Sequence, residues 1–119
     1  MVVEDDPILK NLLGHTFAGK YQTLYAGNGE EALKLFEQFK PSLVLLDLTL
    51  PGSIDGFGVL ETLRKQDGEG KSVPVIVVSN LGEQSAKARA MELGANAYLV
   101  KAEVDIDEIV AKMGEYLHV

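Results

Sequence analysis

Three kinds of reactive side chain stand directly after apolar runs in this 119-residue chain. The carboxylates are Glu4, Asp5 and Asp47, the hydroxyl is Ser79 and the amine is Lys101. If they share one site, the carboxylates repel one another and raise each other's pKa values unless a cation joins them, and such oxygen ligands suit Mg²⁺. The Lys101 ammonium and the Ser79 hydroxyl could each hold a phosphoryl oxygen. Asp47 would then be free to act as the nucleophile of a phosphoryl transfer.

The stretch before Asp47 is the element around which the chain is organised. Leu43–Leu46 is apolar without alternation, which indicates a strand buried on both faces of a parallel sheet. Asp47 would stand at the carboxyl end of that strand, where open α/β sheets place their ligand crevice. On this stretch alone, an Asp47 that merely leaves the core to begin a loop is an equally good interpretation.

Apolar periodicity and turn signals divide the chain into alternating strands and helices. Strands are predicted at residues 1–3, 21–26, 43–46, 73–78 and 97–100. Helices are predicted between 7 and 19, from 28 to 41, after a loop at 52–58, within 80–94 and over 105–118, with a polar turn at 68–71. The alternation indicates a flavodoxin-like (βα)5 fold, a doubly wound five-stranded parallel sheet in the order 2-1-3-4-5 with helices on both faces. Its switch point lies between strands 1 and 3, so Glu4, Asp5 and Asp47 are expected to converge there.

Local signals refine the helices. Asp6 before Pro7 is expected to cap the first helix, and Asn28 could cap the second. The two histidines, His15 and His118, are interpreted as helical surface residues. The predicted buried faces are Ile8, Leu9, Leu12, Leu13 and Phe17 in the first helix, Ala32, Leu33, Leu35, Phe36 and Phe39 in the second, and Ala86, Ala90, Met91 and Leu93 in the fourth.

Composition indicates one globular domain spanning residues 1–119. A net charge of −7 argues against nucleic-acid binding by this domain, which would need a basic face. The chain has no cysteine for thiol chemistry, and no apolar run approaches the ~20 residues of a membrane span. No signal-peptide pattern opens it, so a cytoplasmic location is expected. Because only Met1–Val3 precede the first acids, the natural gene product is expected to begin earlier than this numbering.

Four motifs, in order and each at a strand end, resemble the receiver domains of two-component response regulators over essentially the whole chain. They are Val2-Val3-Glu4-Asp5-Asp6-Pro7, Leu45-Leu46-Asp47-Leu48-Thr49-Leu50-Pro51-Gly52, Val78-Ser79 and Tyr98-Leu99-Val100-Lys101. The resemblance implies that Asp47 is the phosphoacceptor and that Lys101 is the lysine this family carries. It also implies that Ser79 fills the Thr/Ser switch position and that Tyr98 is the aromatic residue whose rotamer reports the state.

The same resemblance implies a Mg²⁺ cofactor. Asp5 and Asp47 would bind the ion directly, Glu4 would act largely through water, and the backbone carbonyl of Thr49 would be a further ligand. A histidine kinase or a histidine phosphotransfer protein would supply the phosphoryl group. Phosphorylation would then change the surface formed by the helix within 80–94, the strand 97–100 and the helix 105–118, which would engage an output domain or protein partner.

Three departures from the family pattern stand near the motifs. Asn80 follows Ser79 where a small residue is usual, and the loop at residues 51–56 is one residue longer than the commonest pattern. Ala102 follows Lys101 where proline is usual. A cis bond before a non-proline residue costs about 2.5–4 kcal/mol, so the bond between Lys101 and Ala102 is expected to be trans, with Lys101 still reaching Asp47.

Two other functions share some of these residues. A haloacid dehalogenase-like phosphatase also uses an Asp nucleophile, a Lys, a Ser/Thr and Mg²⁺, but its nucleophile normally follows the first strand. A pseudo-receiver that binds protein without being phosphorylated is the other, and Asn80 and Ala102 keep it open. The leading hypothesis is a signalling domain that catalyses only its own phosphorylation and dephosphorylation and is not an enzyme acting on an external metabolite. No G-x-x-x-x-G-K-[ST] or G-x-G-x-x-G motif supports a nucleotide site.

Overall fold

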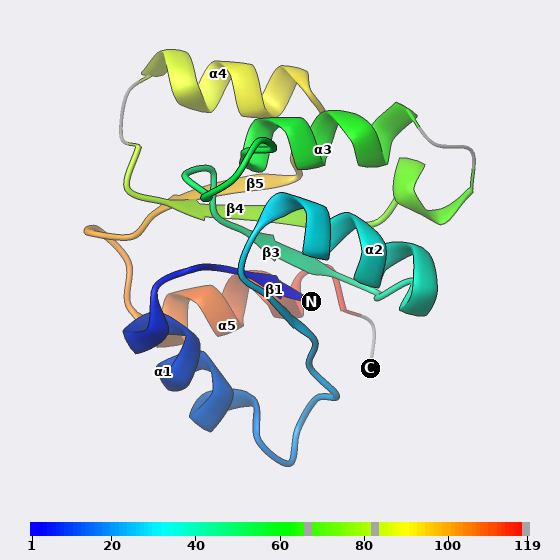
Figure 1. The fold of residues 1–119 in the computed structure, drawn as a ribbon. Helices are drawn as coiled ribbons and strands as arrows, with labels where there is room; N and C mark the ends of the chain where they lie inside the picture. The colour runs from blue at the N-terminus through cyan, green and yellow to red at the C-terminus, as the bar shows by residue number, and fades with distance from the viewer. Residues whose placement is uncertain (66–67, 82–83, 118–119) are drawn as a thin grey trace.

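The computed structural model describes residues 1–65, 68–81 and 84–117. Its sheet has five parallel strands in the order β2-β1-β3-β4-β5, which confirms the predicted flavodoxin-like topology. The strands are β1 (Val2–Val3), β2 (Tyr25–Ala26), β3 (Val44–Leu46), β4 (Val75–Ser79) and β5 (Ala97–Val100). The helices are α1 (Pro7–Phe17), α2 (Gly29–Phe39), α3 (Gly56–Lys65), α4 (Gln84–Glu92) and α5 (Ile106–Gly114), with a 3₁₀ helix η1 (Glu69–Lys71) before β4. Figure 1 shows α1 and α5 on one face of the sheet and α2, α3 and α4 on the other.

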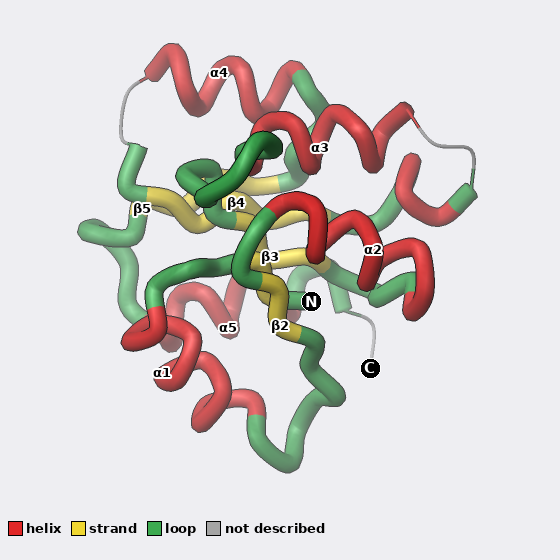
Figure 2. Tube along the Cα trace, in the orientation of Figure 1, coloured by secondary structure: helices red, strands yellow, loops and turns green. Residues whose placement is uncertain are grey.

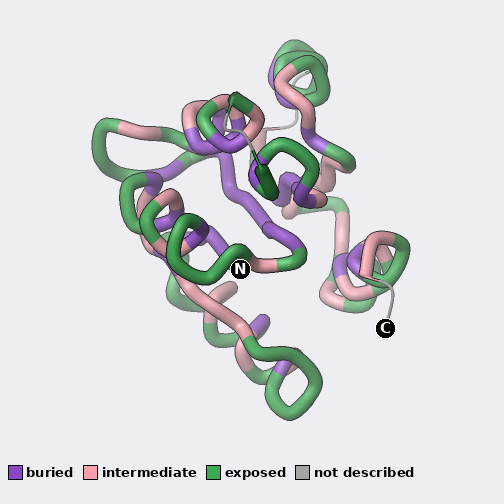
Figure 3. Tube along the Cα trace, turned by 90° about the vertical axis from the view of Figure 1, so that its right-hand side faces the viewer, coloured by how far each residue is buried: buried purple, intermediate pink, exposed green. Residues whose placement is uncertain are grey.

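The central strands β3 and β4 explain why their sequences are apolar throughout. Successive side chains of a strand point to opposite faces, and both faces of this sheet are covered by helices (Figure 2). Val44 and Leu46 accordingly pack with α2 and α3, whereas Leu45 packs with α1 and α5. Strands β1, β3 and β4, which lead to or contain Glu4, Asp47 and Ser79, are buried along their whole length, whereas β5 is half-buried. Figure 3 shows this burial along the chain.

Side-chain caps fix where several helices begin. The Asp6 carboxylate accepts a hydrogen bond from Ile8 N–H at 2.9 Å, and the side-chain Oδ1 of Asn28 accepts from Glu31 N–H at 2.8 Å, as the sequence predicted. Asp105 caps α5 in the same way. These caps satisfy helix N–H groups that have no partner within the helix. Helix α1 begins immediately after the acids at the end of β1, so its start is held close to the sheet edge.

Several predicted boundaries were wrong. Strand β2 holds only Tyr25–Ala26 of the predicted 21–26, because β1, its partner, begins at Val2 and offers residues 21–23 no strand to pair with. Helix α3 begins at Gly56, inside the predicted loop 52–58, because the Asp55 carboxylate accepts from Gly58 N–H at 2.9 Å and caps an earlier turn. The polar turn at 68–71 contains the 3₁₀ helix.

Some side chains predicted to be buried are exposed. Ile8 and Leu12 of α1 are 78% and 48% exposed, because α1 contacts the sheet through the narrower stripe that contains Leu13 and Phe17. Phe39 at the end of α2 and Met91 on α4 are exposed for the same geometric reason. His15 is exposed, as predicted. The prediction for His118 lies outside the described residues. None of the helices in the described ranges has the length and apolar character needed to pass through a lipid bilayer.

Candidate functional site

The carboxyl ends of β1 and β3 bring three carboxylates together. Val3 pairs with Leu46, so the next residues along the two strands, Glu4 and Asp47, emerge side by side. One carboxylate oxygen each of Glu4, Asp5 and Asp47 lies within 4.8 Å of the other two. Glu4 and Asp47 are buried, whereas Asp5 is exposed. The structure thus forms the predicted cluster and opens it to solvent on the Asp5 side.

Lys101 enters this cluster from the end of β5. Its ammonium donates to Glu4 Oε1 at 2.6 Å and to Asp47 Oδ2 at 3.1 Å. The peptide bond between Lys101 and Ala102 is trans, as predicted. The Lys101 N–H also donates to the Ser79 carbonyl at 2.9 Å, which fixes the backbone from which the side chain extends. One ammonium group therefore lies among three carboxyl groups.

Burial and neighbouring charges shift the protonation of this site. Burial raises the pKa of Glu4 from its ordinary 4.5 to about 7, the hydrogen bond from Lys101 opposes that rise, and the nearby Asp47 carboxylate adds to it. Burial lowers the pKa of Lys101, but its hydrogen bonds and attraction to Glu4 and Asp47 outweigh that effect and leave it raised. The lysine is a fixed cation at neutral pH, whereas Glu4 is close to its titration point.

Backbone contacts orient the Asp47 carboxylate. The Thr49 N–H donates to Asp47 Oδ1 at 3.2 Å. The start of α3 contacts the segment that follows β3, because Gly56 N–H donates to the Leu48 carbonyl at 3.0 Å. A Cβ atom at position 56 would lie 2.2 Å from the Asp47 carbonyl oxygen, so only glycine fits there. This role of Gly56 was not predicted, and its only signal in the sequence is a glycine directly after Asp55.

Ser79 and Tyr98 both contact Leu81, in the segment after β4. Ser79 is fully buried, and its hydroxyl oxygen accepts from Leu81 N–H at 3.3 Å. The Tyr98 hydroxyl donates to the Leu81 carbonyl. Two residues predicted as switch positions are thus joined through one residue that the sequence did not single out. Asn80 lies between Ser79 and Leu81 in the chain. It is exposed, so its side chain does not fill the buried space around Ser79.

A comparison with known families agrees with this geometry. The family model of the response regulator receiver domain matches residues 1–113. The chain belongs to that family. It is a receiver domain of two-component signal transduction, and nothing in the match favours a haloacid dehalogenase-like phosphatase.

Individual relatives support the same assignment. The receiver domain is 35% identical to sporulation initiation phosphotransferase F of Bacillus subtilis (strain 168) over 118 residues, covering 98% of this chain and 91% of that protein. It is 40% identical to the probable transcriptional regulator ycf27 of Porphyra purpurea over 103 residues, which are 85% of this chain and 40% of that protein. The chain therefore spans less than half the length of ycf27.

Solved structures share the fold. The BeF3-activated receiver domain of Klebsiella pneumoniae RstA superposes with a TM-score of 0.84 at 27% identity, over 99% of this chain and 97% of that one. A putative response regulator from Chloroflexus aurantiacus superposes with a TM-score of 0.87 at 31% identity, over 97% and 93%. The receiver domain of histidine kinase PA1611 from Pseudomonas aeruginosa, solved with magnesium in its active-site cleft, has a TM-score of 0.85 over 97% and 93% but only 23% identity, which shows the fold alone.

The residues of this receiver domain fit a divalent cation. Three carboxylates within 4.8 Å of one another, one of them exposed, form the hard-oxygen donor set that Mg²⁺ takes while keeping some of its waters. Lys101 supplies only one positive charge against them. Thr49 lies directly beside the cluster, since its N–H contacts Asp47.

Proposed function

We propose that this receiver domain accepts a phosphoryl group on Asp47 from a phosphohistidine of a histidine kinase or histidine phosphotransfer protein. The observation that carries the proposal is the Lys101 ammonium placed on Asp47 Oδ2 and Glu4 Oε1, at the open edge of the sheet. In the transfer, an oxygen of Asp47 attacks phosphorus and an O–P bond forms as the N–P bond to the imidazole breaks. The imidazole leaves and takes up a proton from water.

Each contact of Asp47 has a role in this step. The Thr49 N–H holds one carboxylate oxygen, so the carboxylate has a fixed direction of attack. Lys101 binds a phosphoryl oxygen once the group arrives and offsets its charge. Asp5, Asp47, the Thr49 carbonyl and, through water, Glu4 would hold Mg²⁺, which would supply positive charge against the negative charge of the transfer. No external metabolite is turned over.

An apolar surface beside the site suits the phosphodonor. The exposed side chains of Ile8 and Leu12 lie on α1, the helix that begins directly after the acids that follow β1. Leu12 also lines a pocket of about 500 Å³ that Lys101 and Ile106 share, so the apolar surface reaches the functional lysine. We propose that a helix of the phosphodonor packs here and delivers its histidine to Asp47. Ile8→Ser should then reduce transfer from a protein donor while leaving labelling by a small phosphodonor unchanged.

The signal leaves the site through Leu81. A phosphoryl group on Asp47 draws the Ser79 hydroxyl toward it, and the hydroxyl then gives up its contact with Leu81 N–H. Because the Tyr98 hydroxyl holds the carbonyl of the same residue, the change reaches β5. The surface of α4, β5 and α5 is then the one that engages an output domain or protein partner. Ser79→Ala should permit phosphorylation but uncouple it from partner binding.

Intact-mass spectrometry with a small phosphodonor and Mg²⁺ tests the proposal. The wild-type domain should gain one phosphoryl group, and Asp47→Asn should gain none. Asp107→Asn, which removes an exposed carboxylate on α5, is the matched control and should be labelled like the wild type. Labelling of Asp47→Asn at the wild-type level would overturn the assignment and favour a receiver fold that works by binding alone.

A further inference from the structure

The loop between β3 and α3 is closed at its base and exposed at its tip. Gly56 N–H donates to the Leu48 carbonyl at 3.0 Å, so the two ends of the loop meet directly after the phosphoacceptor. Leu50 is buried in the core, whereas Thr49 and residues 51–53 are exposed. The exposed residues therefore need a contact outside the loop if they are to keep one position.

Glu30, the second residue of α2, makes that contact. The Ser53 hydroxyl donates to Glu30 Oε1 at 2.7 Å, although 23 positions separate the two residues in the chain. The Glu30 carboxylate also lies against the backbone at Gly52, where a Cβ atom would be 3.5 Å from Oε2. In the part of the chain that the structure describes, residues 50–54 make no other hydrogen bond. A hydroxyl bound to a carboxylate at this distance forms one of the stronger kinds of hydrogen bond.

An apolar contact lies directly beside this hydrogen bond. Ile54 packs against Gly29, the first residue of α2, where a Cβ atom would lie 2.5 Å from the Ile54 carbonyl oxygen. A Cβ atom at Gly58 in α3 would lie 3.0 Å from Ile54 Cγ2. Ile54 is thus held between two glycines, one from each helix. Ser53 and Ile54 together dock the loop on the start of α2.

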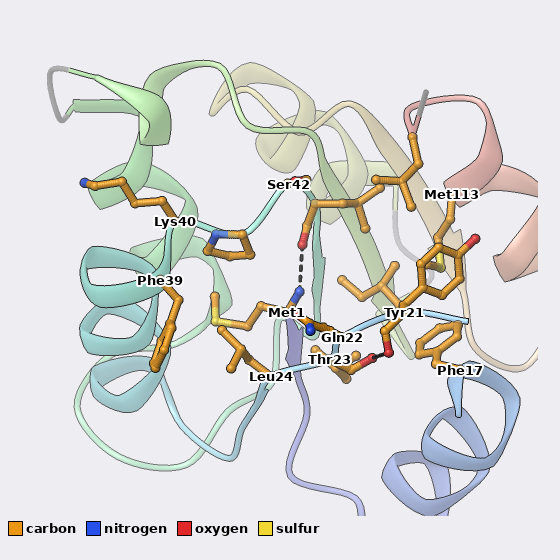
Figure 4. Close-up of a pocket in the computed structure, with 15 residues that line it drawn as sticks. Met1, Phe17, Tyr21, Gln22, Thr23, Leu24, Phe39, Lys40, Ser42 and Met113 are labelled. Carbon is orange, nitrogen blue, oxygen red and sulfur yellow. Dashed lines mark hydrogen bonds between the residues drawn. The ribbon is translucent and has the colours of Figure 1, made fainter. Parts of the chain in front are cut away.

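Helix α2 is a firm support for the docked loop. Its Phe36 side chain is buried in the core, and Lys40 N–H closes the other end of the helix by donating to the Phe36 carbonyl at 2.8 Å. Figure 4 shows Phe39 and Lys40 at that end, where they line a pocket together with Met1. The helix dipole also favours a carboxylate in the first turn, which is where Glu30 stands.

The first part of the same loop carries the backbone that orients Asp47. The Thr49 N–H donates to Asp47 Oδ1 at 3.2 Å, and the Thr49 carbonyl is a cation ligand in the proposed function. If the loop tip were free, Thr49 would be in place in only a fraction of the molecules. Apparent affinity falls in proportion to the fraction of molecules that is competent to bind. A contact at the tip can therefore set the affinity for the cation without touching it.

We propose that Glu30 and Ser53 are positioning residues, whose hydrogen bond docks the loop on α2 and keeps the Thr49 backbone in place beside Asp47. The proposal rests on the proposed function, because it takes Mg²⁺ to bind next to Thr49. The bond also gives a use to the loop at residues 51–56, which is one residue longer than the commonest pattern of the family.

Titration with Mg²⁺ alone, followed by NMR at the Thr49 amide, tests the proposal. Ser53→Ala removes the donor and should raise the Mg²⁺ dissociation constant about fivefold, the equivalent of one hydrogen bond. Ser53→Thr keeps a hydroxyl and should restore the wild-type constant. The melting temperature without Mg²⁺ should change little in either variant, because the bond is exposed. A bond that served stability alone would show the reverse, a lower melting temperature with unchanged affinity.

Glu30→Ala and Glu31→Ala are a matched pair. Each removes an exposed carboxylate from the first turn of α2, but it is Glu30 that bonds to Ser53. Glu30→Ala should weaken Mg²⁺ binding at least as much as Ser53→Ala, whereas Glu31→Ala should have a smaller effect. A chain with both Glu30→Ala and Ser53→Ala should bind Mg²⁺ like Glu30→Ala alone, because both substitutions break the same bond.

Two results would overturn the proposal. One is a Mg²⁺ dissociation constant that is the same for Ser53→Ala and the wild type, and the other is an equal loss in Glu30→Ala and Glu31→Ala. Intact-mass labelling with a small phosphodonor separates this test from that of the proposed function. If Ser53→Ala binds Mg²⁺ more weakly but the wild type takes no label on Asp47, the positioning role stands and the phosphoacceptor assignment fails. If both proteins are labelled with the same Mg²⁺ dependence, only the positioning role fails.

Discussion

At the carboxyl-terminal edge of the sheet, three carboxylates lie around a single ammonium group. At the amino-terminal edge, the Arg64 guanidinium bonds, among the residues that the structure describes, to neutral oxygens. Arg64 donates to the Gly94 carbonyl at 2.9 Å, to the Gly70 carbonyl at 2.9 Å and to Asn96 Oδ1 at 3.1 Å. Asn96 Oδ1 in turn accepts from Val75 N–H at the start of β4. The amino-terminal edge therefore uses a charge to join three segments of backbone.

The difference shows how one sheet separates stability from chemistry. Like charges held together at the carboxylate edge oppose folding until a cation binds among them, so the stability of that edge responds to a ligand. The Arg64 network has all its partners within the protein and gains nothing from a ligand. Substitutions at the two edges should accordingly differ in kind: at the first they change ligand and pH dependence, and at the second they change stability alone.

The largest loss of stability is expected at Gly56, which packs against the backbone of the phosphoacceptor Asp47. Gly56→Ala places a Cβ atom 2.2 Å from the Asp47 carbonyl oxygen, so α3 or the loop after β3 must move. The free energy of unfolding should fall by about 3 kcal/mol, measured by urea denaturation. Gly114→Ala is the matched control, because nothing lies within 4 Å of its Cβ position at the end of α5. It should be neutral or stabilise by about 0.5 kcal/mol, and equal losses in both variants would refute the close approach.

Glu4→Gln should remove a pH dependence of the metal-free domain. The folded pKa of Glu4 is raised to about 7 from 4.5, so the folded state binds more protons than the unfolded state between these values. Stability should thus be highest near the lower pH and decline as pH rises toward 7, by at most about 3 kcal/mol. Urea denaturation across this range should give a flatter profile for Glu4→Gln. Parallel profiles for the two proteins would mean that another group titrates.

Arg64→Met tests the amino-terminal edge of the sheet, where a substitution should lower stability without affecting phosphorylation. It leaves the carbonyls of Gly70 and Gly94 without the donor Arg64 and leaves Asn96 Oδ1 with only the Val75 N–H, at a cost of about 2 kcal/mol in the free energy of unfolding. Lys65→Met, next in the chain, removes only an exposed pair with Glu61 and should cost under about 0.5 kcal/mol. Labelling by a small phosphodonor should be unchanged in both. A labelling defect in Arg64→Met alone would show that the edges are coupled.

Mg²⁺ should raise the melting temperature of the domain, and this stabilisation should be smaller than the three changes predicted above. An ion present at about ten times its dissociation constant stabilises by roughly 1.4 kcal/mol. Asp5→Asn should weaken this response, because Asp5 is the exposed member of the cluster. Asp6→Asn is a suitable control, since asparagine can keep the helix cap that Asp6 makes. A wild-type melting temperature that is the same with and without millimolar Mg²⁺ would contradict the cation site.

The sequence predicted the parts of the site that depend on strand ends. The apolar run Leu43–Leu46 had to be a central strand, and parallel topology then placed Glu4 beside Asp47 and brought Lys101 to the same edge. These inferences need only periodicity and chain order. Caps such as Asp6 were also predictable, because their hydrogen bonds join residues close in sequence.

Features that depend on distant contacts could not be predicted. The need for glycine at position 56 arises from the Asp47 carbonyl across a turn, and Leu81 became important only because Tyr98 reaches its carbonyl from β5. The length of β2 depends on where its partner β1 begins. Ile8 has the helical spacing of a core residue but lies beyond the stripe that the sheet covers.

Locating the phosphoryl group tests the central claim most directly. After reaction with a small phosphodonor and Mg²⁺, borohydride reduces an acyl phosphate to an alcohol and so converts the labelled aspartate to homoserine. Tandem mass spectrometry of the digested protein then identifies the converted position. The account predicts homoserine at position 47 and nowhere else, with conversion dependent on Mg²⁺. Homoserine at position 5, or an unconverted Asp47 in a protein that has gained a phosphoryl group, would contradict it.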